Sequence, residues 1–324
     1  MYRFTTSSPR GRSDNPAIPT PIIIDCDPGH DDAIALLLAL GSPELELLGV
    51  TTTYGNQTLE KTTANALRVL ELAGRSDVPV AAGAAEPLER ELAVAAHVHG
   101  ESGLDGPTLP PPSAEPVTDD AVGWIAGTVA DAAGPVTLVP TGPLTNVARY
   151  LALHGVEGVE RIVLMGGSIA EGNMTPAAEF NIWADPEAAQ AVFQSGLDVT
   201  MIGLDVTHRA VTGPDVQRRL RDAGPIGVFV AELVDFFTVY HRETYGWDGA
   251  PIHDAVAVAH LVRTGLVETE YRNVEVERDS ELCRGRTVVD LWRRTGRPAN
   301  AHVGVDLDTT AFFDLLVERV ARLG

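Results

Sequence analysis

The stretch PIIIDCDPGHDDAIALLLAL, residues 21–40, decides the fold. It opens with a short, continuous apolar run that ends at Asp25, and such a run is typical of a buried strand. Pro28 and Gly29 interrupt the strand, and an apolar helical pattern follows from Asp31 to Leu40. A buried strand, a turn and a helix in this order predict the first unit of a parallel sheet covered by helices.

The same alternation continues along the chain and extends this prediction. Further buried strands are expected at 47–53, 78–82, 136–140, 161–165 and 199–203. Helices are expected at 59–73, 119–132, 144–153, 186–194, 226–240 and 252–262. The proline-rich residues 107–116 predict a surface loop, 274–276 and 287–289 predict antiparallel strands, and a last helix is expected from Thr309. We therefore expect an α/β fold, an open, mostly parallel sheet flanked by helices, formed by one domain at 21–324 behind a disordered tail at 1–20.

Composition limits the function classes. The 324 residues include 24 basic and 45 acidic side chains, a net charge of −21, so the long-range field repels nucleic acid and anionic membranes. A cation or a neutral polar molecule suits this charge better. The longest apolar run, 33–40, is far shorter than the roughly 20 residues that span a bilayer. With no signal-like apolar segment near residue 1 and only Cys26 and Cys283, we expect a cytoplasmic protein.

Four carboxylates crowd the end of the first strand, at Asp25, Asp27, Asp31 and Asp32. Such crowding is unfavourable unless a cation neutralises it, and carboxylate oxygens select a hard ion such as calcium or magnesium. The alternative is that Asp31 and Asp32 only complement the dipole of the helix that they begin. That alternative leaves the two aspartates at the strand end unexplained, so a metal site is the favoured interpretation.

Other strand ends carry further polar residues, and loops from the carboxyl ends of parallel strands converge on one site. Residues 51–56 end in Gly55 and Asn56, and residues 140–146 form a sharp Pro-Thr-Gly-Pro turn whose backbone carbonyls could face a cation. The stretch 165–183 supplies amides and a carboxylate, the groups that bind sugar hydroxyls. Viewed alone, each segment could be an ordinary turn or an exposed polar loop.

Two histidine-containing segments complete the set. His253 and Asp254 precede an apolar helix, which indicates a metal carboxylate beside a group that can donate a proton. An N-cap beside a surface histidine is the alternative. His99 begins a glycine-rich loop at 99–106 that either covers a pocket or lies free on the surface. The aromatic segment 236–247 could stack on a base or pack a helix.

Taken together, these pieces resemble the inosine-uridine-preferring nucleoside hydrolase family. The matching motifs are DCDPGHDD, the Gly55-Asn56 turn, HGESGLDG, PTGPLTN, MGG, the N-x-T-P-x-x-E-F-N-I stretch and PIHDA, and they follow one another in family order from Asp25 to Ala255. The resemblance implies a Ca²⁺ ion bound by the side chains of Asp27, Asp32 and Asp254 and by the backbone carbonyl of Thr141. Asp27 would also be the general base, and Asp25 would support the metal loop.

The resemblance also assigns the substrate contacts. Ribose would be held by Asp31, Asn56, Met165 (through its carbonyl), Asn173, Glu179 and Asn181. His253 would give a proton to the departing base, and His99 would contact the base. The implied reaction is calcium-dependent hydrolysis of ribonucleosides to ribose and free base by a homodimer or homotetramer, with a pyrimidine or inosine-uridine preference. The roles of His30, His241 and Trp247 stay open.

Two other functions compete with this prediction. A phosphatase of the haloacid dehalogenase type would use an aspartate nucleophile and magnesium, which accounts for Asp25 and Asp27 but not for Asn181 or the His253-Asp254 pair. A calcium-dependent nucleoside-binding protein without catalysis would bind the ligand and release no base.

Overall fold

The computed structural model describes residues 18–324, so the part of the expected tail at 1–17 lies outside the described residues. Eight strands form the main sheet in the order β3-β2-β1-β4-β5-β6-β10-β7. Their bounds are β1 Thr20–Cys26, β2 Leu45–Thr52, β3 Val80–Ala82, β4 Val136–Pro140, β5 Val159–Met165, β6 Asp198–Ile202, β7 Val267–Arg272 and β10 Ala301–Leu307. Every neighbouring pair is parallel except β10 with β7, which is antiparallel. The expected open, mostly parallel sheet is confirmed.

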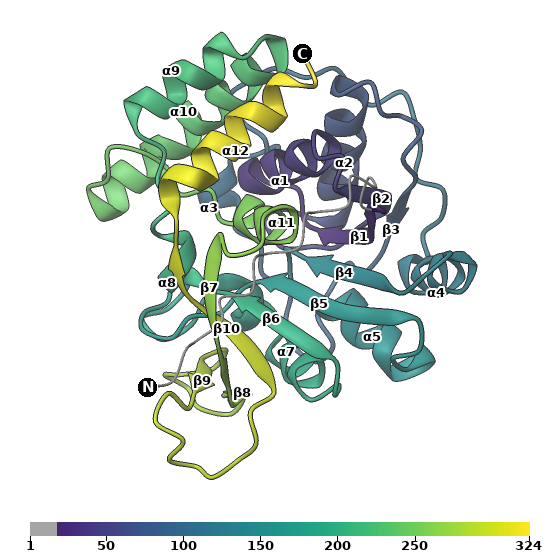
Figure 1. Ribbon diagram of the computed structural model, residues 1–324, viewed down its shortest axis with the longest axis vertical. Coiled ribbons are helices and arrows are strands. Elements are labelled where there is room, and N and C mark those ends of the chain that lie inside the picture. The colour runs from purple at the N-terminus through teal and green to yellow at the C-terminus, as the bar shows by residue number, and fades with distance from the viewer. Residues whose placement is uncertain (1–17) are drawn as a thin grey trace, which may run out of the picture.

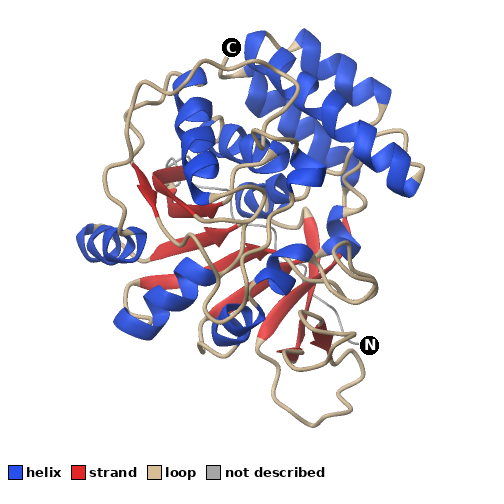
Figure 2. Cartoon of the chain, turned by 180° about the vertical axis from the view of Figure 1, so that it is seen from behind, coloured by secondary structure: helices blue, strands red, loops and turns tan. Residues whose placement is uncertain are grey.

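Helices cover both faces of the sheet (Figures 1 and 2). One face carries α1 His30–Leu40, α2 Leu59–Leu72, α10 Pro225–Tyr245, α11 Asp254–Val262 and α12 Thr309–Ala321, with α9 Pro214–Asp222 packed against α10 and α12. The other face carries α4 Ala121–Asp131, α5 Thr145–His154 and α7 Pro186–Phe193. Two apolar cores result, one on each side of the sheet.

The opening stretch of the sequence lies at the centre of this architecture. Ile22, Ile23 and Ile24 are fully buried because β1 has a strand on either side and helices over both faces. Helix α1 is apolar over most of its surface because α2, α10, α11 and α12 surround it. The polar residues between β1 and α1 are therefore held in the interior, at the carboxyl edge of the sheet.

The six predicted parallel strands and eight predicted helices are all present, with small shifts at their ends. Helix α10 continues to Tyr245, five residues beyond its predicted end at Tyr240. Strands β7 and β10 were not predicted. Charged and polar residues interrupt both, as in VETEYR and AHVGVDL, because β7 is an edge strand and β10 lies beside it.

Shorter elements surround the carboxyl edge of the sheet. They are α3 Ala96–His99, α6 Phe180–Ala184 and α8 Leu204–Thr207. The predicted antiparallel pair is confirmed as β8 Val274–Val276 with β9 Thr287–Val289, and residues 107–116 form the predicted loop. Within residues 18–324, no helix is long and apolar enough to cross a membrane.

Candidate active site

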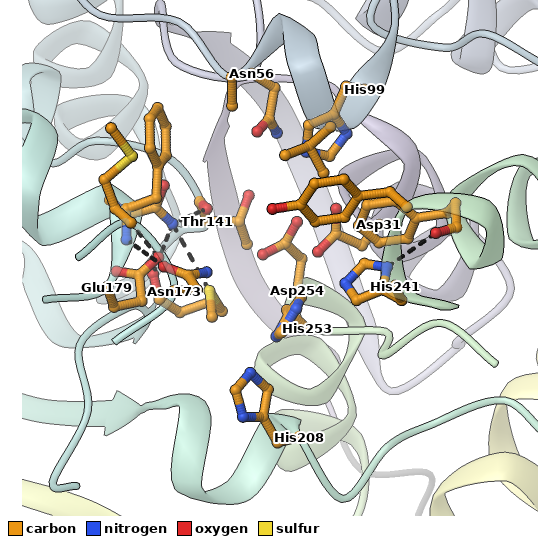
Figure 3. Close-up of a pocket in the computed structure, with 18 of the residues that line it drawn as sticks. Asp31, Asn56, His99, Thr141, Asn173, Glu179, His208, His241, His253 and Asp254 are labelled. Carbon is orange, nitrogen blue, oxygen red and sulfur yellow. Dashed lines mark hydrogen bonds between the residues drawn. The ribbon is translucent and has the colours of Figure 1, made fainter. Parts of the chain in front are cut away.

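Residues from distant parts of the chain meet in one pocket at the carboxyl edge of the sheet (Figure 3). The pocket is lined by ten of the residues predicted from the sequence, namely Asp31, Asn56, His99, Thr141, Met165, Asn173, Glu179, Asn181, His253 and Asp254. The remaining three, Asp25, Asp27 and Asp32, are buried beside it. The structure therefore brings the whole predicted set into one region.

Three carboxylates form the centre of the site. Oxygen atoms of Asp31, Asp32 and Asp254 all lie within 4.8 Å of one another, and all three side chains are buried. Asp31 and Asp32 are in the first turn of α1, and Asp254 begins α11, the helix that packs closely against α1. Burial is the largest cause that raises the pKa of Asp254, followed by the nearby charges of Asp31 and Asp32. A divalent cation would remove this mutual repulsion.

Asp27 lies beside this trio but does not belong to it. Its Oδ2 accepts a hydrogen bond from the backbone N–H of Asn56 at 2.6 Å, whereas its buried Oδ1 has no partner among the described residues. Burial raises the pKa of Asp27 well above its usual range, and the charge of Asp32 raises it further. A buried carboxylate oxygen without a partner is costly, so this atom is available to a cation or to a water molecule.

Asp32 is held firmly by three donors. Its Oδ2 accepts from the backbone N–H of Gly29 at 3.1 Å and from Nδ2 of Asn56 at 2.9 Å. Its Oδ1 accepts from the hydroxyl of Thr141 at 2.8 Å. The turns after β1, β2 and β4 therefore all converge on this single carboxylate.

Asp25 is the centre of a buried hydrogen-bond network beside the pocket. Its Oδ1 accepts from the hydroxyl of Thr51 at 2.5 Å and from Nδ2 of Asn146 at 2.8 Å. Asn146 also donates to the carbonyl of Thr52 and accepts from the backbone N–H of Ala84. Burial raises the pKa of Asp25 to about 6. This network joins β1, β2 and the start of α5.

The amide and carboxylate wall comes from the segment after β5. Glu179 is the N-cap of α6, and its carboxylate accepts from the backbone N–H groups of Gly167, Asn181 and Ile182. Burial raises the pKa of Glu179 to about 7. Nδ2 of Asn181 donates to the carbonyl of Thr141 at 2.6 Å and to that of Met165 at 3.2 Å. Both carbonyls predicted to face ligands thus lie at this one amide.

Histidines line the opposite side. Nδ1 of His253 is 2.7 Å from the hydroxyl of Thr207, and the ring centroid of His208 is 5.6 Å from that of His253. Nδ1 of His99 lies 3.1 Å from Nδ1 of His30, whose Nε2 contacts the carbonyl of Asp105 at 2.8 Å. His30, for which the sequence indicated no role, therefore packs behind His99.

Helix α10 closes the pocket with aromatic side chains. Phe237, Tyr240, His241 and Tyr245 line it, and Trp247 stacks on Tyr245 with centroids 4.8 Å apart. Nδ1 of His241 contacts the carbonyl of Phe237 at 2.8 Å, and burial lowers the pKa of His241 to about 4. The aromatic segment thus both packs α10 and faces the pocket.

Sequence reasoning missed several residues of the site. Thr207 ends α8, a helix of four residues that carries no periodic signal, and His208 is the C-cap that follows it. His97, which was not among the predicted site residues, also lines the pocket, and its ring centroid lies 6.0 Å from that of Tyr240.

Comparison with known proteins agrees with this geometry. Residues 22–314 match the family described as inosine-uridine preferring nucleoside hydrolase. A pyrimidine-specific ribonucleoside hydrolase RihA of Shewanella sp. (strain ANA-3) is 55% identical over 305 residues, covering 93% of this chain and 96% of the relative. A protein of the same name from Salmonella typhi is 55% identical, covering 93% and 98%.

Solved structures show the same fold. The purine-preferring ribonucleoside hydrolase from Gardnerella vaginalis superposes with a TM-score of 0.88 at 34% identity, covering 94% of this chain and 99% of that one. An inosine-guanosine nucleoside hydrolase gives a TM-score of 0.85 at 28% identity, covering 93% and 98%. With sequence, fold and the assembled pocket in agreement, the chain belongs to the inosine-uridine-preferring nucleoside hydrolase family and is a ribonucleoside hydrolase of the N-glycosidase type.

Proposed function

We propose that this enzyme is a calcium-dependent ribonucleoside hydrolase with a preference for pyrimidine nucleosides. The observation that carries the proposal is the buried trio of Asp31, Asp32 and Asp254, faced by amides on one side and by histidines on the other. The base preference is supported by the relatives named pyrimidine-specific at 55% identity, compared with 34% for the purine-preferring structure.

The residues present fit a bound calcium ion. The donors are carboxylate and carbonyl oxygens, the ligands that hard cations select, and the buried Oδ1 of Asp27 has no protein partner among residues 18–324. We propose that Asp27, Asp32 and Asp254 hold the ion with the carbonyl of Thr141. Bound there, calcium would lower the pKa of a coordinated water molecule and help to orient the ribose hydroxyls.

The ribose would lie against the amide and carboxylate wall. Asn173, Glu179 and Asn181 offer both donors and acceptors, which suits hydroxyl groups that donate and accept at once. Asp31, Asn56 and the carbonyl of Met165 would complete the contacts from the other side. Three N–H bonds fix the Glu179 carboxylate, so this wall is organised before the substrate arrives.

The chemistry would divide between two side chains. Asp27 takes a proton from the attacking water through Oδ1, the oxygen without a partner. The C1′–N bond breaks as the sugar gains oxocarbenium character, which the surrounding carboxylates stabilise. His253 gives a proton to the departing base from Nε2, since its Nδ1 faces Thr207. His99 and the aromatic residues of α10 would contact the base.

Following the family resemblance, we also propose a single domain at 21–324, a homodimer or homotetramer, and a cytoplasmic location. The state of assembly is testable by sedimentation of the calcium-loaded enzyme at several concentrations.

The experiment compares ribose release from uridine, cytidine, inosine, adenosine and guanosine by the wild type, Asp254→Asn and a control, Asp248→Asn. Asp248 has a side chain that is 94% exposed, so its loss should change nothing. We expect the highest kcat/KM on uridine or cytidine, and loss of calcium binding and activity in Asp254→Asn alone. Release of phosphate from a phosphate ester, or tight nucleoside binding without base release, would contradict the proposal.

A further inference from the structure

Helix α8 contributes one buried hydroxyl that the proposed chemistry does not yet use. Thr207 is fully buried, and its Oγ1 lies 2.7 Å from Nδ1 of His253, 46 residues away in the chain. Within residues 18–324 this is the only hydrogen bond of the hydroxyl. The backbone groups of Thr207 are already paired, since its N–H donates to Gly203 and its carbonyl accepts from Ala210. The hydroxyl is therefore free to serve the histidine.

The two ring nitrogens of His253 have different surroundings. Nδ1 faces Thr207, whereas Nε2 has no protein partner in the described part of the chain, and the ring lines the pocket. A histidine whose ring is not held can rotate about its Cβ–Cγ bond, which places Cδ2 where Nδ1 was and Cε1 where Nε2 was. The contact with Thr207 opposes this rotation, because the hydroxyl would then face a carbon atom instead of Nδ1.

The hydroxyl hydrogen decides the tautomer. A buried hydroxyl whose hydrogen finds no acceptor is unfavourable. If neutral His253 carried its proton on Nδ1, that N–H would donate to Oγ1 and leave the hydroxyl hydrogen without an acceptor. When Thr207 donates to Nδ1 instead, both groups are satisfied and the ring proton lies on Nε2. To give its Nε2 proton to the base and end as a neutral ring, His253 must carry a proton on Nδ1 as well. The hydroxyl of Thr207 then rotates and accepts from Nδ1–H, because it has both donor and acceptor capacity.

We propose that Thr207 is a positioning residue that holds His253 through Nδ1 and so presents an Nε2–H group to the departing base. The proposal rests on the proposed function, in which His253 protonates the base. Thr207 is not among the residues that line the pocket, and its hydroxyl acts only through the ring of His253.

The test uses a pair of substrates that differ in their need for a proton donor. Uridine must lose a poor leaving group, whereas a 4-nitrophenyl riboside releases a phenolate that is stable without protonation. Thr207→Val keeps the shape of the side chain and removes the hydroxyl, and Thr207→Ser keeps the hydroxyl. Thr212→Val is the matched control, since Thr212 is also fully buried but its hydroxyl bonds to the backbone of Ala250.

A general-acid contribution of about 10²–10⁴-fold sets the scale of the effect. For Thr207→Val, with calcium present, we expect kcat/KM on uridine to fall at least tenfold more than on the nitrophenyl riboside. Thr207→Ser should recover most of this loss, and Thr212→Val should leave the ratio of the two rates unchanged. The double variant Thr207→Val/His253→Ala should be no slower on uridine than His253→Ala, because two residues that act through one ring are not additive.

Equal losses on both substrates, a fully additive double variant, or no loss in Thr207→Val would each overturn the inference. Activity on the nitrophenyl riboside shows that each variant is folded. The proposed function fails separately if His253→Ala cleaves uridine as fast as the wild type, whatever the result at Thr207.

Discussion

The substitution Gly142→Ala should displace Asp27, the proposed general base. Gly142 lies in the turn after β4, and a Cβ atom built there would be 2.5 Å from Oδ1 of Asp27 and 3.1 Å from Cγ2 of Thr53. The backbone of Gly142 is outside the left-handed region, so alanine is permitted conformationally and its effect is steric. To restore a separation of 3.0 Å, the carboxylate of Asp27 must retreat by at least 0.5 Å.

The size of that displacement sets the expected loss. A misplacement of about 1 Å in a catalytic group costs on the order of 10²-fold in rate. We therefore expect Gly142→Ala to lower kcat/KM on uridine by about 10-fold to 100-fold, which corresponds to about 1.4–2.7 kcal/mol. Because the same oxygen is a proposed calcium ligand, calcium affinity should fall as well.

Ribose release and calcium titration calorimetry measure the two effects. Gly127→Ala is the matched control, because nothing lies within 4 Å of its added Cβ in helix α4. That control should be active and slightly more stable, since alanine favours a helix by about 0.5–1 kcal/mol. If Gly142→Ala kept calcium affinity and kcat/KM within twofold of the wild type, the assignment of Asp27 as base and ligand would be refuted.

Three further predictions concern stability. Asn146→Ala should lower the free energy of unfolding by about 2–3 kcal/mol in urea titrations, because it leaves the N–H of Ala84 without a partner and removes one of the two donors to Asp25. A loss under 1 kcal/mol would contradict the proposed network. His241 has a pKa of about 4 in the folded protein, below its ordinary 6.5. Between these values the unfolded chain binds more protons than the folded one, so the free energy of unfolding decreases as the pH is lowered. Relative to His241→Gln, the wild type should lose up to about 3 kcal/mol from pH 7 to pH 4, and a constant difference would contradict this. Calcium at 100 times its Kd should add about 2.7 kcal/mol, so a chelator should lower the Tm of the wild type by about 5 °C and leave that of Asp254→Asn unchanged.

The sequence predicted the centre of the sheet well because burial there is complete. Strands such as β1, with Ile22 to Ile24 enclosed on both faces, read as continuous apolar runs. The site motifs were also readable, since they follow these strands directly. Strand β7 was not readable, because the edge of the sheet exposes its charged residues and weakens its apolar pattern.

The contacts within the site needed the structure. The sequence indicated a metal loop but not that Asp31, rather than Asp27, shares the trio with Asp32 and Asp254. Nor could it show that Thr207 meets His253, because the two residues approach only when β6 and α11 are packed in place. Such long-range pairs depend on the register of the whole sheet, which no local pattern encodes.

The most direct test of the account is removal and return of calcium during uridine hydrolysis. The enzyme is stripped with a chelator, dialysed, and assayed for ribose and uracil with calcium added back in steps. We expect no release from the stripped enzyme, and equimolar ribose and uracil as calcium fills one site per chain. Full activity in the stripped enzyme, with calcium shown to be absent, would contradict the central claim.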